Sequence, residues 1–390
     1  ASGRECLDLG VAATPTVGVA VQAFGGAGAV QVSASHNPRD YNGMKLFGSD
    51  GRVIPGSVGA GVLESYRELE RDPNRQPWSE VGKLGCRKLL EDPHRPHLER
   101  VLATVDVEAI RKRRLRVLVD SNHGAGSILA KRLLDALGCE YRILGGDPDG
   151  QFEHPPEPIR ENLSEVGQRV LDEGFDIGFC QDPDADRLAI LDERGEYIGE
   201  EYTSVLCMKL ALMHRKGPLV TNCASSSMTE VLAAQVGVPF YRSKVGEANV
   251  VDCMLQHGAL YGGEGSGGPI DPRIVLVRDS IGGMAQVLDL MVATGKTPSQ
   301  LVEELPKFIM IKDKMALSKE ALDRSIDRLK DALGADSVSM QDGVRLAWSD
   351  CWILLRGSNT EPLVRLIAEG KDVETVQGLI GRAKEAIRGL

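Results

Sequence analysis

Residues 176–191 read Asp-Ile-Gly-Phe-Cys-Gln-Asp-Pro-Asp-Ala-Asp-Arg-Leu-Ala-Ile-Leu, and they contain the pattern on which the fold prediction depends. An apolar run of strand length (Ile177–Cys180) ends in an acidic turn, and a second apolar run follows from Leu188. Apolar runs of about four to six residues alternate with helical segments almost throughout the chain, which is typical of βα units on largely parallel sheets. The sequence therefore predicts an α/β protein with polar loops at the ends of its strands.

The same alternation continues on both sides of that stretch and divides the chain into four series. The first has a strand around Leu7–Leu9, a helix capped by Thr14 with Pro15 in its first turn, and a strand over Ala29–Val32. The polar segment Asp92–His97 resembles a linker. The last series has strands at Val344–Ala347, Trp352–Leu355 and Leu363–Ala368 between helices Lys319–Leu333 and Val373–Ile387. We therefore expect three similar α/β domains with mixed sheets, over residues 1–100, 101–200 and 201–306, and a C-terminal α+β domain over 307–390.

Composition limits the classes of function. The 390 residues carry a formal net charge of −10, which disfavours binding to nucleic acid by phosphate neutralisation. The uncharged stretch Leu9–Pro38 is interrupted by proline, glutamine and glycine, so we expect no membrane span. The eight cysteines form no CxxC pair, which fits free thiols in a reducing cytoplasm.

Asp182, Asp184 and Asp186 alternate along the acidic turn. Three carboxylates spaced in this way can converge on Mg²⁺ or Ca²⁺, and their pooled charge needs such a cation. A calcium EF-hand is one alternative, because Glu193 falls at its twelfth position, but Arg187 stands where that loop needs glycine and the flanks read as strands. A solvated acidic turn also remains open.

Two other polar segments follow strands and offer reactive groups. Ser33-Ala-Ser35-His36-Asn37-Pro38 places a hydroxyl beside an imidazole, which suits a nucleophile, although an ordinary Ser/Asn/Pro turn has the same composition. Nearby Lys45 could act as an acid or a base, or be a surface lysine.

Two loops nearer the C-terminus suit a phosphorylated sugar. Arg356-Gly-Ser358-Asn359-Thr360, with Arg365 beyond it, could hold a phosphate dianion or be a polar hairpin loop. The segment 263–268 matches GxGxxG, but Pro269-Ile-Asp-Pro272 follows in place of a helix, which excludes a dinucleotide site. Its Glu264 and Ser266 are better suited to binding sugar hydroxyls.

Taken together and in this order, the four segments resemble those of the α-D-phosphohexomutases, which include phosphoglucomutase, phosphomannomutase and phosphoglucosamine mutase. The resemblance extends over essentially the whole chain and implies four domains around a central cleft. It implies that Ser35 is the phosphorylated serine, that Asp182, Asp184 and Asp186 bind Mg²⁺ together with the Ser35 phosphoryl group, and that the substrate contacts are Lys244, Glu264, Ser266, Arg356, Ser358, Asn359, Thr360 and Arg365.

The family reaction implies the remaining roles. Hexose 6-phosphate and hexose 1-phosphate would interconvert through phospho-Ser35 and a hexose 1,6-bisphosphate, which also serves as activator. His36 and Lys45 are candidates for proton transfer, and Arg187 for stabilising the transferred charge. We expect a cytoplasmic monomer or homodimer; a phosphosugar phosphatase and a non-catalytic phosphosugar-binding protein are the alternatives.

Departures from the family pattern bear on the substrate and on the start of the chain. Gly268 stands where many members have His, and Lys244-Val-Gly-Glu247 is nearer to phosphoglucosamine mutases than to phosphomannomutase/phosphoglucomutase enzymes. We therefore favour glucosamine phosphate over mannose or glucose phosphate. Family members have a Gly-Thr-x-Gly-x-Arg-Gly loop and a βα unit before the segment matched by 1–10, so we expect an N-terminally incomplete first domain that exposes apolar surface.

Overall fold

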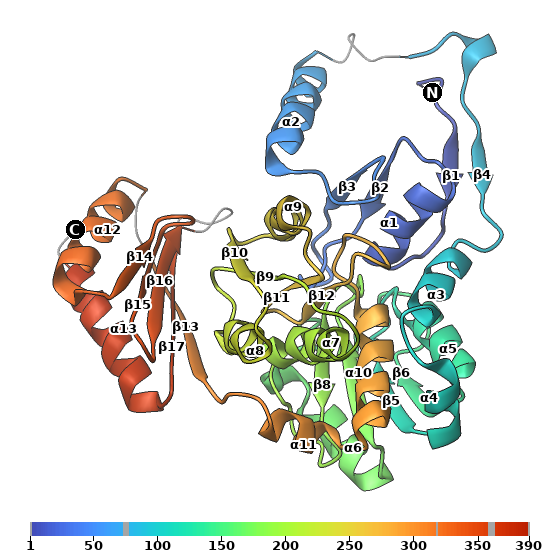
Figure 1. The fold of residues 1–390 in the computed structure, drawn as a ribbon. Helices are drawn as coiled ribbons and strands as arrows, with labels where there is room; N and C mark the ends of the chain where they lie inside the picture. The colour runs from blue at the N-terminus through green and yellow to red at the C-terminus, as the bar shows by residue number, and fades with distance from the viewer. Residues whose placement is uncertain (1, 73–77, 317–318, 358–362, 389–390) are drawn as a thin grey trace. The chain divides into compact units, whose positions relative to one another are not determined.

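The computed structural model describes residues 2–72, 78–316, 319–357 and 363–388 (Figure 1). Its internal contacts divide the chain into two compact units. The first unit comprises Ala1–Arg215 and Leu260–Val302, and the second comprises Lys216–Ala259 and Glu303–Leu390. Within the described ranges no helix is both long and apolar enough to cross a bilayer.

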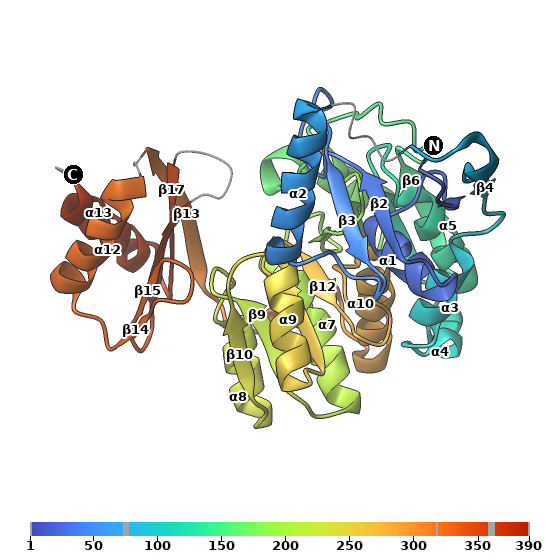
Figure 2. The same cartoon turned by 90° about the horizontal axis from the view of Figure 1, so that it is seen from above.

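The first unit begins with two small sheets. The parallel pair is β1 (Cys6–Asp8) with β4 (Arg87–Leu89) (Figure 1). The antiparallel pair is β2 (Gly28–Val32) with β3 (Met44–Gly48) (Figure 2). The helices of this region are α1 (Thr14–Ala23), α2 (Gly56–Arg71) and the 3₁₀ turn η2 (Val81–Lys83). The predicted helix from Thr14 and the predicted strand over 29–32 are both confirmed.

One face of the β2–β3 pair is apolar and lies open to solvent. Val30, Val32 and Met44 are 61%, 65% and 71% exposed. Alternation along each strand puts Gln31 and Phe47 on the other face, where both are buried. The β2–β3 pair therefore presents an apolar face to solvent.

A mixed four-stranded sheet forms the centre of the first unit. Its order is β6-β5-β7-β8, with parallel pairs except between β7 and β8. The strands are β5 (Arg116–Asp120), β6 (Glu140–Leu144), β7 (Ile177–Gln181) and β8 (Leu188–Leu191). The helices that accompany it are α3 (Arg95–Leu102), α4 (Val107–Arg113), α5 (Ser127–Ala136), the 3₁₀ turn η3 (Arg160–Asn162) and α6 (Ser164–Glu173). Every residue of β7 and β8 is buried, so the loop between these strands starts and ends inside the core.

The prediction of a linker over Asp92–His97 is wrong. Helix α3 begins at Arg95, and His97 is fully buried. Its Nδ1 lies 2.9 Å from Thr16 Oγ1, and its Nε2 lies 3.0 Å from Asp279 Oδ2. The polar residues that resembled a solvated linker thus include a buried hydrogen-bonding group, whose partners come from distant parts of the chain.

The remainder of the first unit is helical apart from one hairpin. Helices α7 (Glu200–His214) and α10 (Ser280–Thr294) are mostly buried and pack against each other. Strands β11 (Tyr261–Glu264) and β12 (Gly268–Ile270) form the antiparallel hairpin, and α11 (Pro298–Glu303) ends at the unit boundary.

The second unit contains a parallel strand pair and an antiparallel sheet. The pair is β9 (Leu219–Asn222) with β10 (Phe240–Ser243), accompanied by α8 (Met228–Val236) and α9 (Glu247–His257). The sheet has the order β13-β17-β16-β15-β14, formed by β13 (Ile309–Ala316), β14 (Ser337–Ser339), β15 (Val344–Ala347), β16 (Trp352–Gly357) and β17 (Leu363–Gly370).

Two helices cover one face of this antiparallel sheet. They are α12 (Lys319–Leu333) and α13 (Val373–Ile387) (Figure 1). Trp352, Leu354 and Ile367 point to the opposite face and pack with Cys223. The predicted C-terminal α+β arrangement of these strands and helices is confirmed.

Candidate active site

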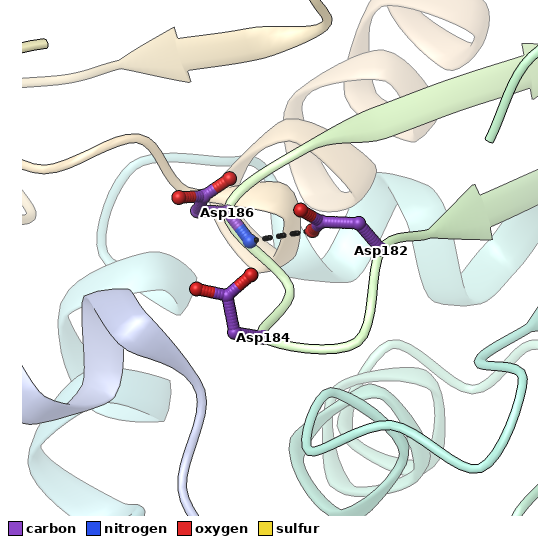
Figure 3. Close-up of side chains that lie close together, drawn as sticks. All are labelled: Asp182, Asp184 and Asp186. Carbon is purple, nitrogen blue, oxygen red and sulfur yellow. Dashed lines mark hydrogen bonds between the residues drawn. The ribbon is translucent and has the colours of Figure 1, made fainter. Parts of the chain in front are cut away.

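The acidic loop between β7 and β8 carries three buried aspartates. Asp182, Asp184 and Asp186 are 0%, 2% and 0% exposed, and one oxygen from each lies within 4.8 Å of the others (Figure 3). The Oδ1 atoms of Asp184 and Asp186 are buried without a hydrogen-bond partner. Hard oxygen atoms that converge in this way, with two of them unsatisfied, fit a small divalent cation such as Mg²⁺.

Asp182 also fixes the shape of the loop. Its Oδ1 accepts a hydrogen bond from the backbone N–H of Asp186 at 3.0 Å (Figure 3). The same oxygen accepts one from the backbone N–H of Arg187, also at 3.0 Å. Ala185 adopts a left-handed φ of 56°, which is a strained conformation for alanine. Burial excludes the solvated acidic turn, and the flanking strands exclude an EF-hand, whose loop joins two helices.

Basic side chains surround the three acids. Lys45 Nζ lies 2.5 Å from Asp184 Oδ2 and 2.6 Å from Asp186 Oδ2. Arg278 Nη2 lies 2.6 Å from the same Asp186 oxygen. Burial, reinforced by repulsion from Asp186 and Asp184, raises the pKa of Asp182 well above its usual value. Burial also opposes ionisation of Asp186, but Arg278 and Lys45 outweigh it and hold the pKa of Asp186 below its usual value.

Ser35 faces this cluster from the loop that follows β2. Its Oγ lies 3.5 Å from Asp182 Oδ2 and 3.4 Å from His36 Nδ1. Ser35 has a left-handed φ of 51°, and its N–H donates to Ser33 Oγ at 2.9 Å. A strained serine whose hydroxyl points at a buried charge cluster is suited to act as a covalent acceptor.

His36 and Arg187 share a carboxylate that the sequence analysis missed. Glu157 Oε1 lies 3.9 Å from His36 Nε2 and 3.6 Å from Arg187 Nη1. Burial, together with the Arg187 charge, lowers the pKa of His36. The sequence signal for Glu157 is its place between Pro156 and Pro158, which restrict the loop that presents it.

Two helix starts hold the acidic loop. The prediction that Thr14 caps helix α1 is wrong. The N-cap is Ala13, and no side chain caps the helix. The Thr14 hydroxyl instead lies 2.6 Å from Asp184 Oδ2, and the Thr14 N–H donates to the Asp184 carbonyl at 2.9 Å. At the start of α10, the Ser280 hydroxyl donates to the Ala185 carbonyl at 2.7 Å. The loop conformation therefore depends on residues far from it in the sequence.

The β11–β12 hairpin places Glu264 and Ser266 beside the same acids. Arg278 Nη1 lies 2.9 Å from Glu264 Oε2 and 3.5 Å from Ser266 Oγ, while its Nη2 contacts Asp186. Arg278 was not predicted from the sequence, in which its local signal is a charge at the end of the apolar run 274–277. Because a strand, and no helix, follows the glycine loop, a dinucleotide site is excluded as predicted.

The second unit contains the other predicted substrate contacts. Arg356 is buried, and its Nε lies 3.0 Å from Asp342 Oδ2, which also accepts from the Val245 N–H at 3.0 Å. Arg365 is exposed and lies opposite Arg356 in the β16–β17 register, and Lys244 is exposed next to Val245. The predicted contacts Ser358, Asn359 and Thr360 lie outside the described residues.

Family models match the chain from end to end. They are phosphoglucomutase/phosphomannomutase alpha/beta/alpha domain I over residues 1–72, domain II over 95–195, domain III over 199–308 and the C-terminal domain over 310–386. A "Phosphoglucomutase/phosphomannomutase" of Thermococcus kodakarensis is 35% identical over 396 residues, which cover 100% of this chain and 85% of the relative. A "Probable phosphoglucosamine mutase" of Methanothermobacter thermautotrophicus is 33% identical, covering 98% and 83%.

Solved structures agree with the sequence relatives. A phosphoglucomutase/phosphomannomutase family protein from Burkholderia thailandensis superposes with a TM-score of 0.84 at 26% identity, covering 100% of this chain and 83% of that one. The Aspergillus fumigatus N-acetylphosphoglucosamine mutase, solved with GlcNAc-6P and magnesium, superposes at 0.64 with 15% identity, covering 96% and 92%, and so shares the fold. The chain thus has the four-domain α/β architecture with mixed sheets that the resemblance implied.

Proposed function

Because the chain belongs to the phosphoglucomutase/phosphomannomutase family of phosphohexomutases, we propose that it interconverts glucosamine 6-phosphate and glucosamine 1-phosphate through phospho-Ser35. Enzymes of this family are isomerases that act as intramolecular phosphotransferases. One observation carries the proposal for this chain. The Ser35 hydroxyl lies 3.5 Å from the Asp182 carboxylate, in a buried cluster of acids and bases that can balance the charge of a phosphoryl group.

Asp182, Asp184 and Asp186 would hold Mg²⁺. The unsatisfied Oδ1 atoms of Asp184 and Asp186 support this assignment, because a buried carboxylate oxygen without a partner is costly. When bound, Mg²⁺ would offset charge on the transferred phosphoryl group.

The protein's own residues account for the transfer. The bond between phosphorus and Ser35 Oγ breaks while a bond forms from phosphorus to a free hydroxyl oxygen of the hexose monophosphate. The proton of that hydroxyl passes to His36 or Lys45, and Arg187 stabilises the charge in transit. The resulting hexose 1,6-bisphosphate reorients in the site and returns its other phosphoryl group to Ser35. The same bisphosphate would activate an unphosphorylated enzyme.

Binding of the sugar divides between two sets of residues. Glu264 and Ser266 would bind hydroxyl groups in either orientation of the sugar. Arg356, Arg365 and Lys244 would bind the phosphate that does not react, together with Ser358, Asn359 and Thr360. A guanidinium anchored at Nε, as Asp342 anchors Arg356, can still present its two terminal nitrogens to a phosphate.

The amino sugar is favoured by the segment Lys244-Val-Gly-Glu247 and by relatives named phosphoglucosamine mutase. Glucose or mannose phosphate is the alternative substrate, which the name of the relative at 35% identity supports. Parallel rates with Mg²⁺ on the 1-phosphates of glucosamine, mannose, glucose and N-acetylglucosamine decide between them. The fastest turnover is expected with glucosamine 1-phosphate.

Two measurements test the reaction itself. Intact mass should reveal a labile phosphate on the wild type, absent from Ser35→Ala. Release of inorganic phosphate in step with substrate loss would identify a phosphatase and contradict a mutase.

The proposal also includes the cytoplasm as the site of action, which fits the free thiols of the described cysteines. It includes a monomer or homodimer as the active state.

A further inference from the structure

Arg278 connects the two loops to which the proposed function assigns the metal and the sugar. We propose that Arg278 is a positioning residue that holds Glu264 in its sugar-binding place against the acidic loop, and so sets the affinity for the sugar phosphate. This inference rests on the proposed function, because it assigns Glu264 to the sugar.

The contacts of Arg278 engage both ends of its guanidinium fork. Nη2 donates to Asp186 Oδ2 at 2.6 Å, and Nη1 donates to Glu264 Oε2 at 2.9 Å. The Arg278 side chain is 11% exposed, and the two carboxylates are 0% and 8% exposed. A planar guanidinium can bond two separate carboxylates at fixed directions, which the point charge of a lysine cannot reproduce.

Gly268 provides the space that the Arg278 side chain occupies. A Cβ built on Gly268 would lie 2.3 Å from Arg278 Cδ and 2.8 Å from Cγ, closer than atoms can approach. Gly268 is also the direct register partner of Glu264 in the β11–β12 hairpin. The position of Arg278 therefore depends on the glycine at residue 268. Any larger residue there would displace the arginine from Glu264.

Charge explains why Glu264 needs this partner. A buried carboxylate is costly unless it is hydrogen-bonded, and Arg278 Nη1 donates a hydrogen bond to Glu264 Oε2. This bond fixes the orientation in which Glu264 accepts hydrogen bonds from hydroxyl groups. At Asp186 the arginine engages Oδ2, the oxygen that Lys45 also contacts, and leaves Oδ1 without a partner. The contact with Asp186 therefore serves to anchor Arg278 and does not take the free metal-binding oxygen.

Four variants test this arrangement: Arg278→Met, Arg278→Lys, Gly268→Ala and the double variant Gly268→Ala/Arg278→Met. Arg273→Met is the matched control, because Arg273 lies in the same β12–α10 segment and pairs with Asp271. The readouts are KM and kcat for the sugar phosphate that the wild type turns over best, and the dissociation constant of Mn²⁺ from the free enzyme. A Tm for each variant establishes that it is folded.

We expect Arg278→Met to raise KM by about tenfold to a hundredfold, the range for a lost charge-assisted hydrogen bond, without weakening Mn²⁺ binding. Arg278→Lys should recover only part of the loss, and Gly268→Ala should raise KM in the same direction. The double variant should be no worse than Arg278→Met, because the alanine acts only by displacing an arginine that is no longer there. Arg273→Met should leave KM within about twofold of the wild type.

Three results would overturn the inference: an unchanged KM for folded Arg278→Met, full activity of Arg278→Lys, or losses that multiply in the double variant. A wild type that turns over no hexose phosphate refutes the proposed function itself. An active wild type whose Arg278→Met variant is equally active refutes only the role of Arg278.

Discussion

Each unit contains a cluster of charged side chains that are at least partly buried, aspartates in the first unit and arginines (Arg242, Arg345 and Arg356) in the second. In the first unit three aspartates converge, and burial with mutual repulsion raises the pKa of Asp182. In the second unit Arg345 lies 4.5 Å over the Trp352 ring, and burial together with the nearby Arg242 charge lowers the pKa of Arg345 to about 10. The Arg345 Nε is buried without a partner, as are two oxygens of the acidic cluster.

The difference between the clusters indicates what each can receive. Buried like charges are costly when unpaired, so a ligand of opposite sign that satisfies them is bound with that free energy in its favour. The acidic cluster suits a cation, and the arginine-rich cluster suits an anion such as phosphate. A mutase needs both, because one phosphoryl group reacts while the other is only held.

The largest expected effect tests whether the phosphoryl transfer takes place at Ser35, beside the acidic cluster. Ser35→Ala should lower the turnover of hexose phosphate by at least about 10³-fold, because it removes the hydroxyl that would accept the phosphoryl group. A coupled assay of product formation measures the loss. Ser339→Ala, in the exposed strand β14, is the control and should retain wild-type turnover. Turnover of Ser35→Ala within about tenfold of the wild type would contradict the assignment.

The second prediction concerns the cation that the acidic cluster would bind. Saturating Mg²⁺ should raise the Tm of the wild type, since a ligand present at a hundred times its dissociation constant adds about 2.7 kcal/mol to the free energy of unfolding. Asp184→Asn replaces a charged ligand and should abolish most of this shift and reduce turnover. Asp192→Asn, which alters a buried carboxylate paired with Arg194, should keep the shift. A Mg²⁺ shift of wild-type size in Asp184→Asn would show that the ion binds elsewhere.

Local patterns predicted the centre of the acidic cluster but not its surroundings. The acidic triplet lies in one turn after one strand, so its convergence follows from spacing that is visible in the sequence. Arg278 and Thr14 were missed because they reach the acidic loop from 92 and 170 residues away, as single side chains on otherwise apolar segments. The linker prediction at His97 failed for the same reason, since its partners lie 81 and 182 residues away.

The elements themselves were more predictable than the contacts between them. Strand β15 and helices α12 and α13 have the predicted bounds, because alternation and helical periodicity are local properties. Hydrogen bonds made by Asp342 could not be foreseen, since its partners come from β16 and from the loop after β10. The four domain boundaries remain predictions, because the contacts within the chain divide it into two units only.

The third prediction tests the arginine-rich cluster through Asp342. Asp342→Ala removes the acceptor shared by Arg356 Nε and the Val245 N–H, so both predicted substrate-binding loops lose an anchor. KM for the sugar phosphate should rise by about tenfold, the lower part of the range for a hydrogen bond to a charged group, with a smaller change in kcat. Asp342→Asn keeps one acceptor oxygen, so its KM should lie between that of the wild type and that of Asp342→Ala.

Asp327→Ala is the control for this prediction. It removes an exposed ion pair with Lys330 in the same unit and should leave KM within about twofold of the wild type. A loss confined to kcat in Asp342→Ala, with KM unchanged, would place the role of Asp342 outside phosphate binding. The Mg²⁺ shift in Tm should be unaffected in both variants, since the acidic cluster lies in the other unit.

The smallest expected effect concerns how the stability of the two units depends on pH. His154 Nε2 lies 2.8 Å from Asp120 Oδ2 in the first unit. Burial alone would lower the pKa of His154, but the hydrogen bond and charge of Asp120 outweigh it and raise the pKa. A raised pKa in the folded state means that the protonated imidazole stabilises the fold below about pH 6.5 and that this stability is lost as the pH rises through the folded pKa. The loss should be below about 1 kcal/mol, because solvent screens the partly exposed pair.

The slope of Tm against pH between about 6 and 8 measures this contribution. His154→Gln keeps a polar side chain but cannot take up the proton, so its slope should be shallower than that of the wild type. His257→Gln is the comparison in the second unit, where the centroids of the His257 and Tyr241 rings lie 3.6 Å apart, and its slope measures what that histidine contributes. A slope in His154→Gln equal to the wild type would assign the pH dependence to another group. A slope abolished by His257→Gln would move that dependence to the second unit and reverse the contrast between the two units.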